Sequence, residues 1–331
     1  MKAIKILLVS IVTLGLASCE DYLTTEPLTT VTDANYYKTP SDAYTALVGC
    51  YDGLQTVWAG GVALPLAAEV MSDNCFGGTG ASDAYNYQAM DHFDISLAPS
   101  YQNLFGDNWS AYYRAVYRVN VLLSKMEQIE WGTEANLRSV YEAEARFIRA
   151  YLYFDMVRMW GNIPLVTEAT TENVPQADPV DVYELIAEDL VFAAENLASQ
   201  PYTSQDPATY GRASKWAAES LIGRVYLYYT GYYGQPDLAG VVNQSQALAY
   251  LEDVITNGGF GLVQDFANLW PAASVENYAG EDNQETVFGI KYTFTSDYNG
   301  NTDGNHWMVM FGLREQSFYP YGNGWGGGTV N

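Results

Sequence analysis

The sequence predicts a mainly α-helical protein, built as an array of stacked helical hairpins with a few short strands. Two observations lead to this fold class. Six segments carry apolar residues at the three- and four-residue spacing of amphipathic helices. One of these segments is apolar around most of its circumference, so we expect other helices to cover it on several sides.

The helices can be placed in order along the chain from their caps and apolar spacing. We expect them from a Ser41 or Asp42 cap through Leu54, over about 103–129, from a cap near Thr133 to Trp160, and over about 181–198, 212–231 and 244–257. Apolar and polar residues then alternate over 285–294, which predicts a strand.

Internal similarity supports the stacking of these helices. The segment Arg149–Phe154 recurs 75 residues later as Arg224–Tyr229, and Arg114-Ala115 precedes Arg149-Ala150 by 35 residues. Tetratricopeptide helix pairs repeat at about 34 residues, so these separations are close to one and two periods. The sequence therefore favours a tetratricopeptide-like array of helical hairpins.

The first nineteen residues have the organisation of an export signal. A short cationic stretch precedes an apolar run over 6–16, which is too short for a bilayer-spanning helix of about 20 residues. The run ends in Leu16-Ala17-Ser18-Cys19, which resembles the lipobox of bacterial lipoproteins; an ordinary secretory cleavage site is the alternative. We expect a signal peptide over 1–18, lipidation at Cys19, a tether over 19–40 and a helical-repeat domain over 41–331.

Composition argues against two classes of partner. The chain has 39 acidic and 15 basic residues, and removal of two signal-peptide lysines changes its net charge from −24 to −26. Because nucleic acids and anionic lipid head groups both attract Lys and Arg, we expect neither to bind, and membrane contact only through the lipid anchor. An exported protein permits a disulfide between Cys50 and Cys75, but the helical position of Cys50 favours a small buried thiol.

No residue pattern indicates catalysis, a cofactor or a metal. Neither His92 nor His306 has the spacing of a nucleophile or metal site. Residues 297–304 place oxygen ligands at alternate positions, as calcium loops do, but the sixth position lacks Gly and Met308 replaces the closing Glu, which favours a solvated turn. A glycosidase acid pair cannot be recognised either, because carboxylate separation cannot be read from sequence.

Several segments resemble the SusD/RagB family of outer-membrane lipoproteins from Bacteroidetes. They are Cys19–Pro27, Ser41–Tyr51, Trp109-x3-Tyr113-x6-Asn120, Ala145–Leu165 and Arg212–Leu227, of which Ala145–Leu165 is the most specific. The resemblance implies four tetratricopeptide-like units supporting a loop-rich binding face. It also implies a position on the outer face of the outer membrane, beside a SusC-type TonB-dependent barrel. Family members are usually longer, so we expect the C-terminal part to be incomplete here.

Loop aromatics beside short polar side chains are the candidate ligand-binding residues. The C–H faces of sugars stack on flat rings while their hydroxyls bond to amides and carboxylates. Two groups have this composition, and the resembled family uses the same regions: Asp73, Asn74, Tyr85, Asn86 and Tyr87, and later Tyr298, Trp307, Tyr319 and Tyr321. By contrast, Trp109, Trp160 and Trp216 lie in helical patterns and are expected in the core.

The leading functional hypothesis is capture of a surface glycan or oligosaccharide and its delivery to the SusC-type transporter, without catalysis. Peptide capture by the same kind of protein is the nearest alternative. A lipid-anchored all-α glycosidase and a helical-repeat scaffold without a small ligand belong to other classes.

Overall fold

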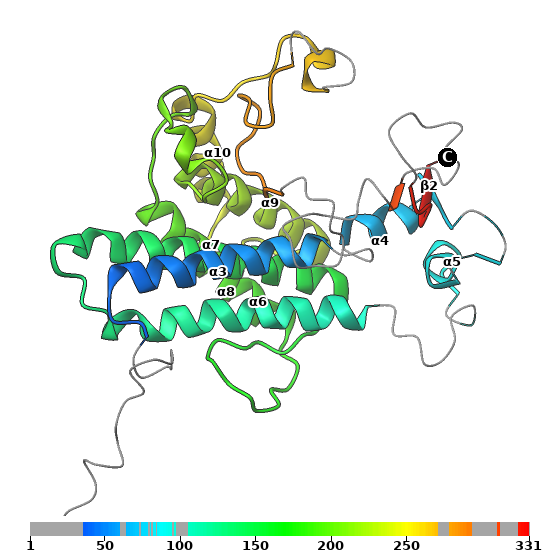
Figure 1. The fold of residues 1–331 in the computed structure, drawn as a ribbon, viewed down its shortest axis with the longest axis horizontal. Coiled ribbons are helices and arrows are strands. Elements are labelled where there is room, and N and C mark those ends of the chain that lie inside the picture. The colour runs from blue at the N-terminus through cyan, green and yellow to red at the C-terminus, as the bar shows by residue number, and fades with distance from the viewer. Residues whose placement is uncertain are drawn as a thin grey trace, which may run out of the picture.

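A computed structural model of the chain confirms the mainly α-helical fold (Figure 1). It describes residues 36–59, 64–72, 74–78, 80, 82–83, 85–94, 96, 105–270, 278–292, 310–311 and 324–330. Cys19, the tether up to residue 35 and residues 297–304 lie outside these ranges.

All six predicted helices are present. They are α3 (Pro40–Ala59), α6 (Gly106–Lys125), α7 (Ala135–Trp160), α8 (Pro179–Asn196), α9 (Lys215–Tyr233) and α10 (Gln244–Asn257). Two short helices, α4 (Leu64–Val70) and α5 (Tyr85–Asp91), and two short strands, β1 (Cys75–Gly77) and β2 (Gly328–Val330), complete the elements relevant to function.

Local side-chain caps explain where several helices begin. At the start of α3 the Asp42 carboxylate accepts hydrogen bonds from the backbone amides of Thr39 and Lys38 at 2.9 and 3.0 Å. Asp42 therefore lies in the first turn of the helix and caps it from there, and Thr39 is the residue just before the helix. Asn243 and Gln246 form a complete capping box at α10. These contacts satisfy amide groups that have no intrahelical partner.

Helix α7 is the centre of the array. Helices α3, α6 and α8 all pack on it, and α8, α9 and α10 then follow one another (Figure 1). Burial all round α7 explains its apolar circumference, because each large side chain removed from water stabilises the fold by about 1.5–3 kcal/mol. Of the predicted core tryptophans, Trp216 is buried, whereas Trp109 and Trp160 are half-buried and pack against the core, edge-on to each other with ring centres 5.1 Å apart.

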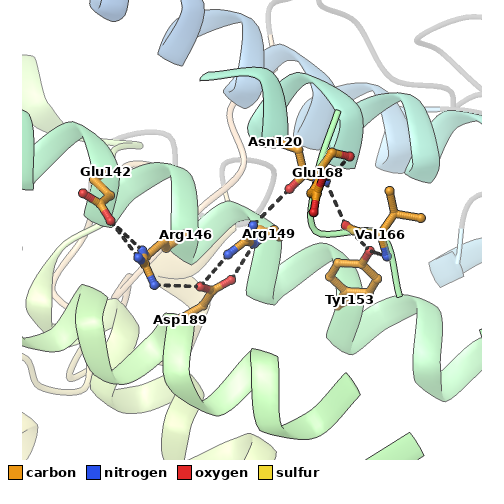
Figure 2. A network of polar contacts seen from close by, with 8 residues as sticks. All are labelled: Asn120, Glu142, Arg146, Arg149, Tyr153, Val166, Glu168 and Asp189. Atoms are coloured by element: carbon orange, nitrogen blue, oxygen red, sulfur yellow. Dashed lines mark hydrogen bonds and ion pairs between the residues drawn. The ribbon is translucent and has the colours of Figure 1, made fainter. Parts of the chain in front are cut away.

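A buried polar network joins three helices and one loop (Figure 2). The Arg149 guanidinium on α7 donates twice to Asp189 on α8, at 2.7 and 2.9 Å, and once to the Asn120 side-chain oxygen on α6 at 3.0 Å. Asn120 in turn donates to the carbonyl of Val166, which also accepts from the Tyr153 hydroxyl. This network fixes the segment after α7 against the array.

The strand predicted over 285–294 is wrong for the part that the structure describes. Residues 285–292 pair with no strand, and their alternation has another cause. The Phe288 ring packs on Phe147 of α7 with centres 5.0 Å apart, and the Tyr292 hydroxyl donates to the Gln55 carbonyl of α3 at 2.8 Å. The apolar residues therefore face helices, and no neighbouring strand supplies a ladder.

The thiol expectation for Cys50 is confirmed. Cys50 and Cys75 are both free and buried, and burial raises the pKa of Cys50 to about 12. Within the described part of the chain, no helix is both long and apolar enough to cross a bilayer.

Candidate functional site

A small lobe lies at one side of the helical array, where α4, α5 and β2 come together (Figure 1). We define it by 64–94 and by 310–311 and 324–330, so far as the structure describes them. Its core contains Ala67, Val70, Cys75, Tyr87, Met90 and Met310. The lobe thus joins residues from before α6 to residues near the end of the chain.

Backbone pairing holds these two parts of the lobe together. Strands β1 and β2 are antiparallel, with Gly77 opposite Gly328, and the Gly78 amide donates to the Gly327 carbonyl at 2.9 Å. The Gly327 amide then donates to the Met310 carbonyl at 2.8 Å. Close packing at these positions demands glycine: a Cβ on Gly77 would lie 2.4 Å from the Tyr87 carbonyl oxygen.

Side chains then fix the lobe's loops. Asp91 at the end of α5 accepts from the Gly77 amide at 3.0 Å, and the Gln88 amide donates to the Gly80 carbonyl at 2.7 Å. Gln88 is buried, so its polar group is satisfied within the lobe. Tyr87 is only 8% exposed, and burial raises the pKa of its hydroxyl to about 12.

Four aromatic side chains are exposed on this lobe. Phe76 on β1, Tyr85 on α5, Phe93 and Trp325 have 53%, 49%, 71% and 45% of their surface accessible. Such rings usually mark interaction surfaces when several occur together. With the exposed amide of Asn74 nearby in the chain, they offer the stacking faces and hydrogen-bonding groups that sugar recognition requires.

Comparison with known proteins places this fold in a family. The family model described as "Starch-binding associating with outer membrane" matches residues 65–227. A SusD-like protein of Bacteroides ovatus is 26% identical over 297 residues, which are 87% of this chain and 50% of that protein. The chain belongs to the SusD-like family.

Solved SusD-like structures agree with this assignment. A laminarin-binding SusD-like protein superposes with a TM-score of 0.64 at 26% identity, over 84% of this chain and 58% of that one. Surface glycan-binding protein A of Bacteroides thetaiotaomicron, solved with laminarihexaose, shares the fold with a TM-score of 0.70 at 21% identity, over 89% of this chain and 60% of that one. This SusD-like chain spans about half the length of the curated relatives it matches.

The structure places part of the first predicted group of site residues on the lobe. Tyr85 and Asn74 are exposed, Asn86 is half-buried, and Tyr87 supports the lobe from within. Tyr85, Asn86 and Tyr87 belong to helix α5, although the sequence suggested a loop. The Asn74 amide donates to the Glu69 carboxylate at 3.2 Å, which ties it to α4.

The other predicted residues, Asp73, Tyr298, Trp307, Tyr319 and Tyr321, lie outside the described residues. Described neighbours of the second group, Met310 and Gly327, nevertheless contact the lobe that carries the first group. The structure therefore brings Met310 and Gly327 against the first group, while the positions of those five side chains stay a prediction.

Sequence reasoning missed three exposed rings of the lobe. Phe76 and Phe93 flank α5 without a helical or strand period, and Trp325 lies in a Gly-rich segment that matches Gly-x-Gly-x-x-Gly only formally. The usable signal was composition: an isolated aromatic among glycines has few neighbours that could bury it.

A cavity of about 790 Å³ lies outside the lobe, between α6, α7 and the segment 167–169. Its arginines are already occupied, since Arg138 pairs with Glu127, Arg146 with Glu142, and Arg149 with the buried Asp189. Those groups stabilise the array, so we place the candidate ligand site on the lobe.

Proposed function

We propose that this SusD-like chain captures glycans at the cell surface and delivers them to a SusC-type TonB-dependent transporter. The supporting observation is that four exposed aromatic side chains belong to one lobe, whose two halves come from distant parts of the chain. The matched family description, which names starch binding and the outer membrane, supports the same function, as does a relative named for laminarin binding. Within this proposal the protein binds its ligand without chemical change.

Affinity electrophoresis tests glycan capture. The mature chain is run through gels that contain starch, laminarin or another polysaccharide, and at least one should retard it. Tyr85→Ala and Trp325→Ala should weaken binding about 5- to 30-fold, because loss of an aromatic anchor costs about 1–2 kcal/mol. Phe266→Ala is the matched control, since Phe266 is exposed on the segment after α10.

The outcomes separate the competing functions. Absence of retardation on every glycan, with a barrel co-purifying, would favour a scaffold, and binding of peptides alone would favour peptide capture. Hydrolysis of a bound glycan by the purified protein would overturn the non-enzymatic proposal.

Anchoring to the outer membrane through Cys19 is a separate part of the proposal. Cys19→Ala should move the protein from the membrane fraction to the soluble fraction, because a lipidated cysteine is its only proposed membrane contact. Continued membrane retention of the variant would contradict the anchor.

A further inference from the structure

A cavity lined by arginines and aromatic rings lies beside the lobe. It has a volume of about 270 Å³ and is formed by residues of α3, α4, α7 and α9. Helix α4 connects it to the lobe, because Ala68 lines the cavity whereas Ala67 and Val70 belong to the lobe core. A ligand held on the lobe could therefore place one of its groups in this cavity.

One guanidinium of the cavity is held in a fixed position. The buried Asp155 carboxylate accepts from the Trp58 indole and the Tyr112 hydroxyl, each at 3.1 Å, and also from Arg158. The Arg158 Nε donates to the Phe154 carbonyl at 3.0 Å, and its Cζ lies 4.1 Å from the centre of the Phe154 ring. The Nη1 group of Arg158 makes no hydrogen bond with any residue that the structure describes, so its donors are available.

A second guanidinium, that of Arg224 on α9, also lines the cavity. Arg224 is solvent-exposed and forms no ion pair or hydrogen bond within the described part of the chain. The Tyr151 hydroxyl makes no hydrogen bond there either. Tyr151, Arg158 and Arg224 all line the same cavity, and burial raises the pKa of Tyr151, so its hydroxyl keeps its proton and can donate.

The charges in the cavity favour one anion. Burial raises the pKa of Asp155 to about 6, so it is mostly ionised at neutral pH and offsets Arg158, while Arg224 leaves one positive charge. Guanidinium groups recognise carboxylates and other oxyanions through paired N–H donors. The volume is slightly below the usual range of ligand pockets, about 300–1,000 Å³, which suits one sugar unit rather than a long chain.

We propose that this cavity binds the anionic group of an acidic sugar, a uronate carboxylate or a sulfate ester, within the glycan that the lobe captures. Arg224 and the Nη1 group of Arg158 contact the oxyanion, the Tyr151 hydroxyl donates a third hydrogen bond, and the Trp58 ring lines the sugar. The inference rests on the proposed glycan-binding function and adds to it a preference for acidic glycans.

Isothermal titration of the full mature chain tests this site. The probes are oligogalacturonate for the carboxylate, a sulfated galactan oligosaccharide for the sulfate, and laminarihexaose and maltohexaose as neutral glycans. Arg224→Gln should weaken an acidic probe roughly 10- to 100-fold, since hydrogen bonds to charged groups are lost, and leave neutral glycan binding unchanged. The affinity of Arg224→Lys for an acidic probe should lie between those of the wild type and Arg224→Gln, because lysine keeps the charge and loses the paired donors.

Arg114→Gln is the matched control, because Arg114 is an exposed arginine on α6 that makes no ion pair within the described residues. The urea midpoints of the variants should equal that of the wild type. Tight binding of neutral glycans with no added affinity for either acidic probe would overturn this inference alone. Binding of no glycan at all would overturn the proposed function with it, and equal weakening of acidic and neutral probes by Arg224→Gln would show a structural role.

Discussion

The substitution Gly77→Ala should open the lobe without unfolding the helical array. A Cβ at residue 77 would lie 2.4 Å from the Tyr87 carbonyl oxygen and 2.7 Å from the Gln88 amide nitrogen, whereas ordinary contact begins at 3.4 Å. These atoms belong to the backbone of α5, so no flexible side chain can move aside. Strand β1 must therefore retreat from α5 by about 1 Å.

The cost has two parts. Overpacking a filled site costs about 1–3 kcal/mol. The retreat also weakens the hydrogen bond from the Gly77 amide to the Asp91 carboxylate, which is 3.0 Å long, and such bonds to charged groups contribute about 1.5–3 kcal/mol. A total cost of at least about 2 kcal/mol shifts the equilibrium between the closed lobe, with β1 packed on α5, and an open lobe about 30-fold toward the open form. Because only the closed lobe presents its rings together, apparent glycan affinity falls with the closed fraction.

Titration calorimetry with a glycan that retards the wild type measures this effect. We expect Gly77→Ala to bind more weakly, by up to about 30-fold, while its far-UV circular dichroism stays close to that of the wild type, since α4 and α5 contribute only 7 residues each. Gly80→Ala is the matched control in the same lobe, because no atom of the described residues lies within 4 Å of its added Cβ. If the glycan affinity of Gly77→Ala lies within twofold of the affinities of the wild type and of Gly80→Ala, the reasoning is refuted.

Three further predictions concern the array. Arg149→Leu should lower the free energy of unfolding by about 3–5 kcal/mol in urea titrations, because it leaves the buried Asp189 unpaired, whereas Arg138→Leu at an exposed pair should cost under about 1 kcal/mol. Burial raises the pKa of Glu219 to about 7, so the folded state holds a proton that the unfolded state releases; stability should fall between about pH 4.5 and 7, and Glu219→Gln should flatten that profile. The buried Cys50 thiol should react with a thiol reagent only after denaturation.

Each of these has a contrary outcome. Equal costs for the two arginine variants would remove the role assigned to the buried pair. A pH profile identical in wild type and Glu219→Gln would exclude that carboxyl as its origin. Fast labelling of Cys50 in the native protein would contradict its burial within α3.

The array could be predicted because its signals are long. Each of its six helices spans at least 14 residues, enough for a 3.6-residue period to be recognised. The internal repeat predicted which apolar positions are buried: Ala115, Ala150 and Val225 all are. It did not predict the environment of the arginine before each of them, since Arg149 is buried and Arg224 is exposed. Which acid pairs with a buried arginine depends on helix packing, and no local pattern encodes it.

The lobe could not be assembled from sequence in the same way. Its strands have 3 residues each, and Gly77 pairs with Gly328, 251 positions later in the chain. Neither the register nor the contact has a local signature at that separation. The exposed position of Tyr85 could be predicted from composition, but the burial of Tyr87 could not, because it depends on Met310 and Gly327 arriving from the far end of the chain.

Hydrogen–deuterium exchange with and without a bound oligosaccharide tests the glycan-binding lobe most directly. The full chain is labelled at saturating concentrations of a glycan that retards it in gels, and protection is mapped by peptide. We predict ligand-dependent protection in 74–91 and 324–330, with α8 and α10 unchanged. Protection confined to the helical array, or to the cavity between α6 and α7, would contradict the placement of the binding site on the lobe.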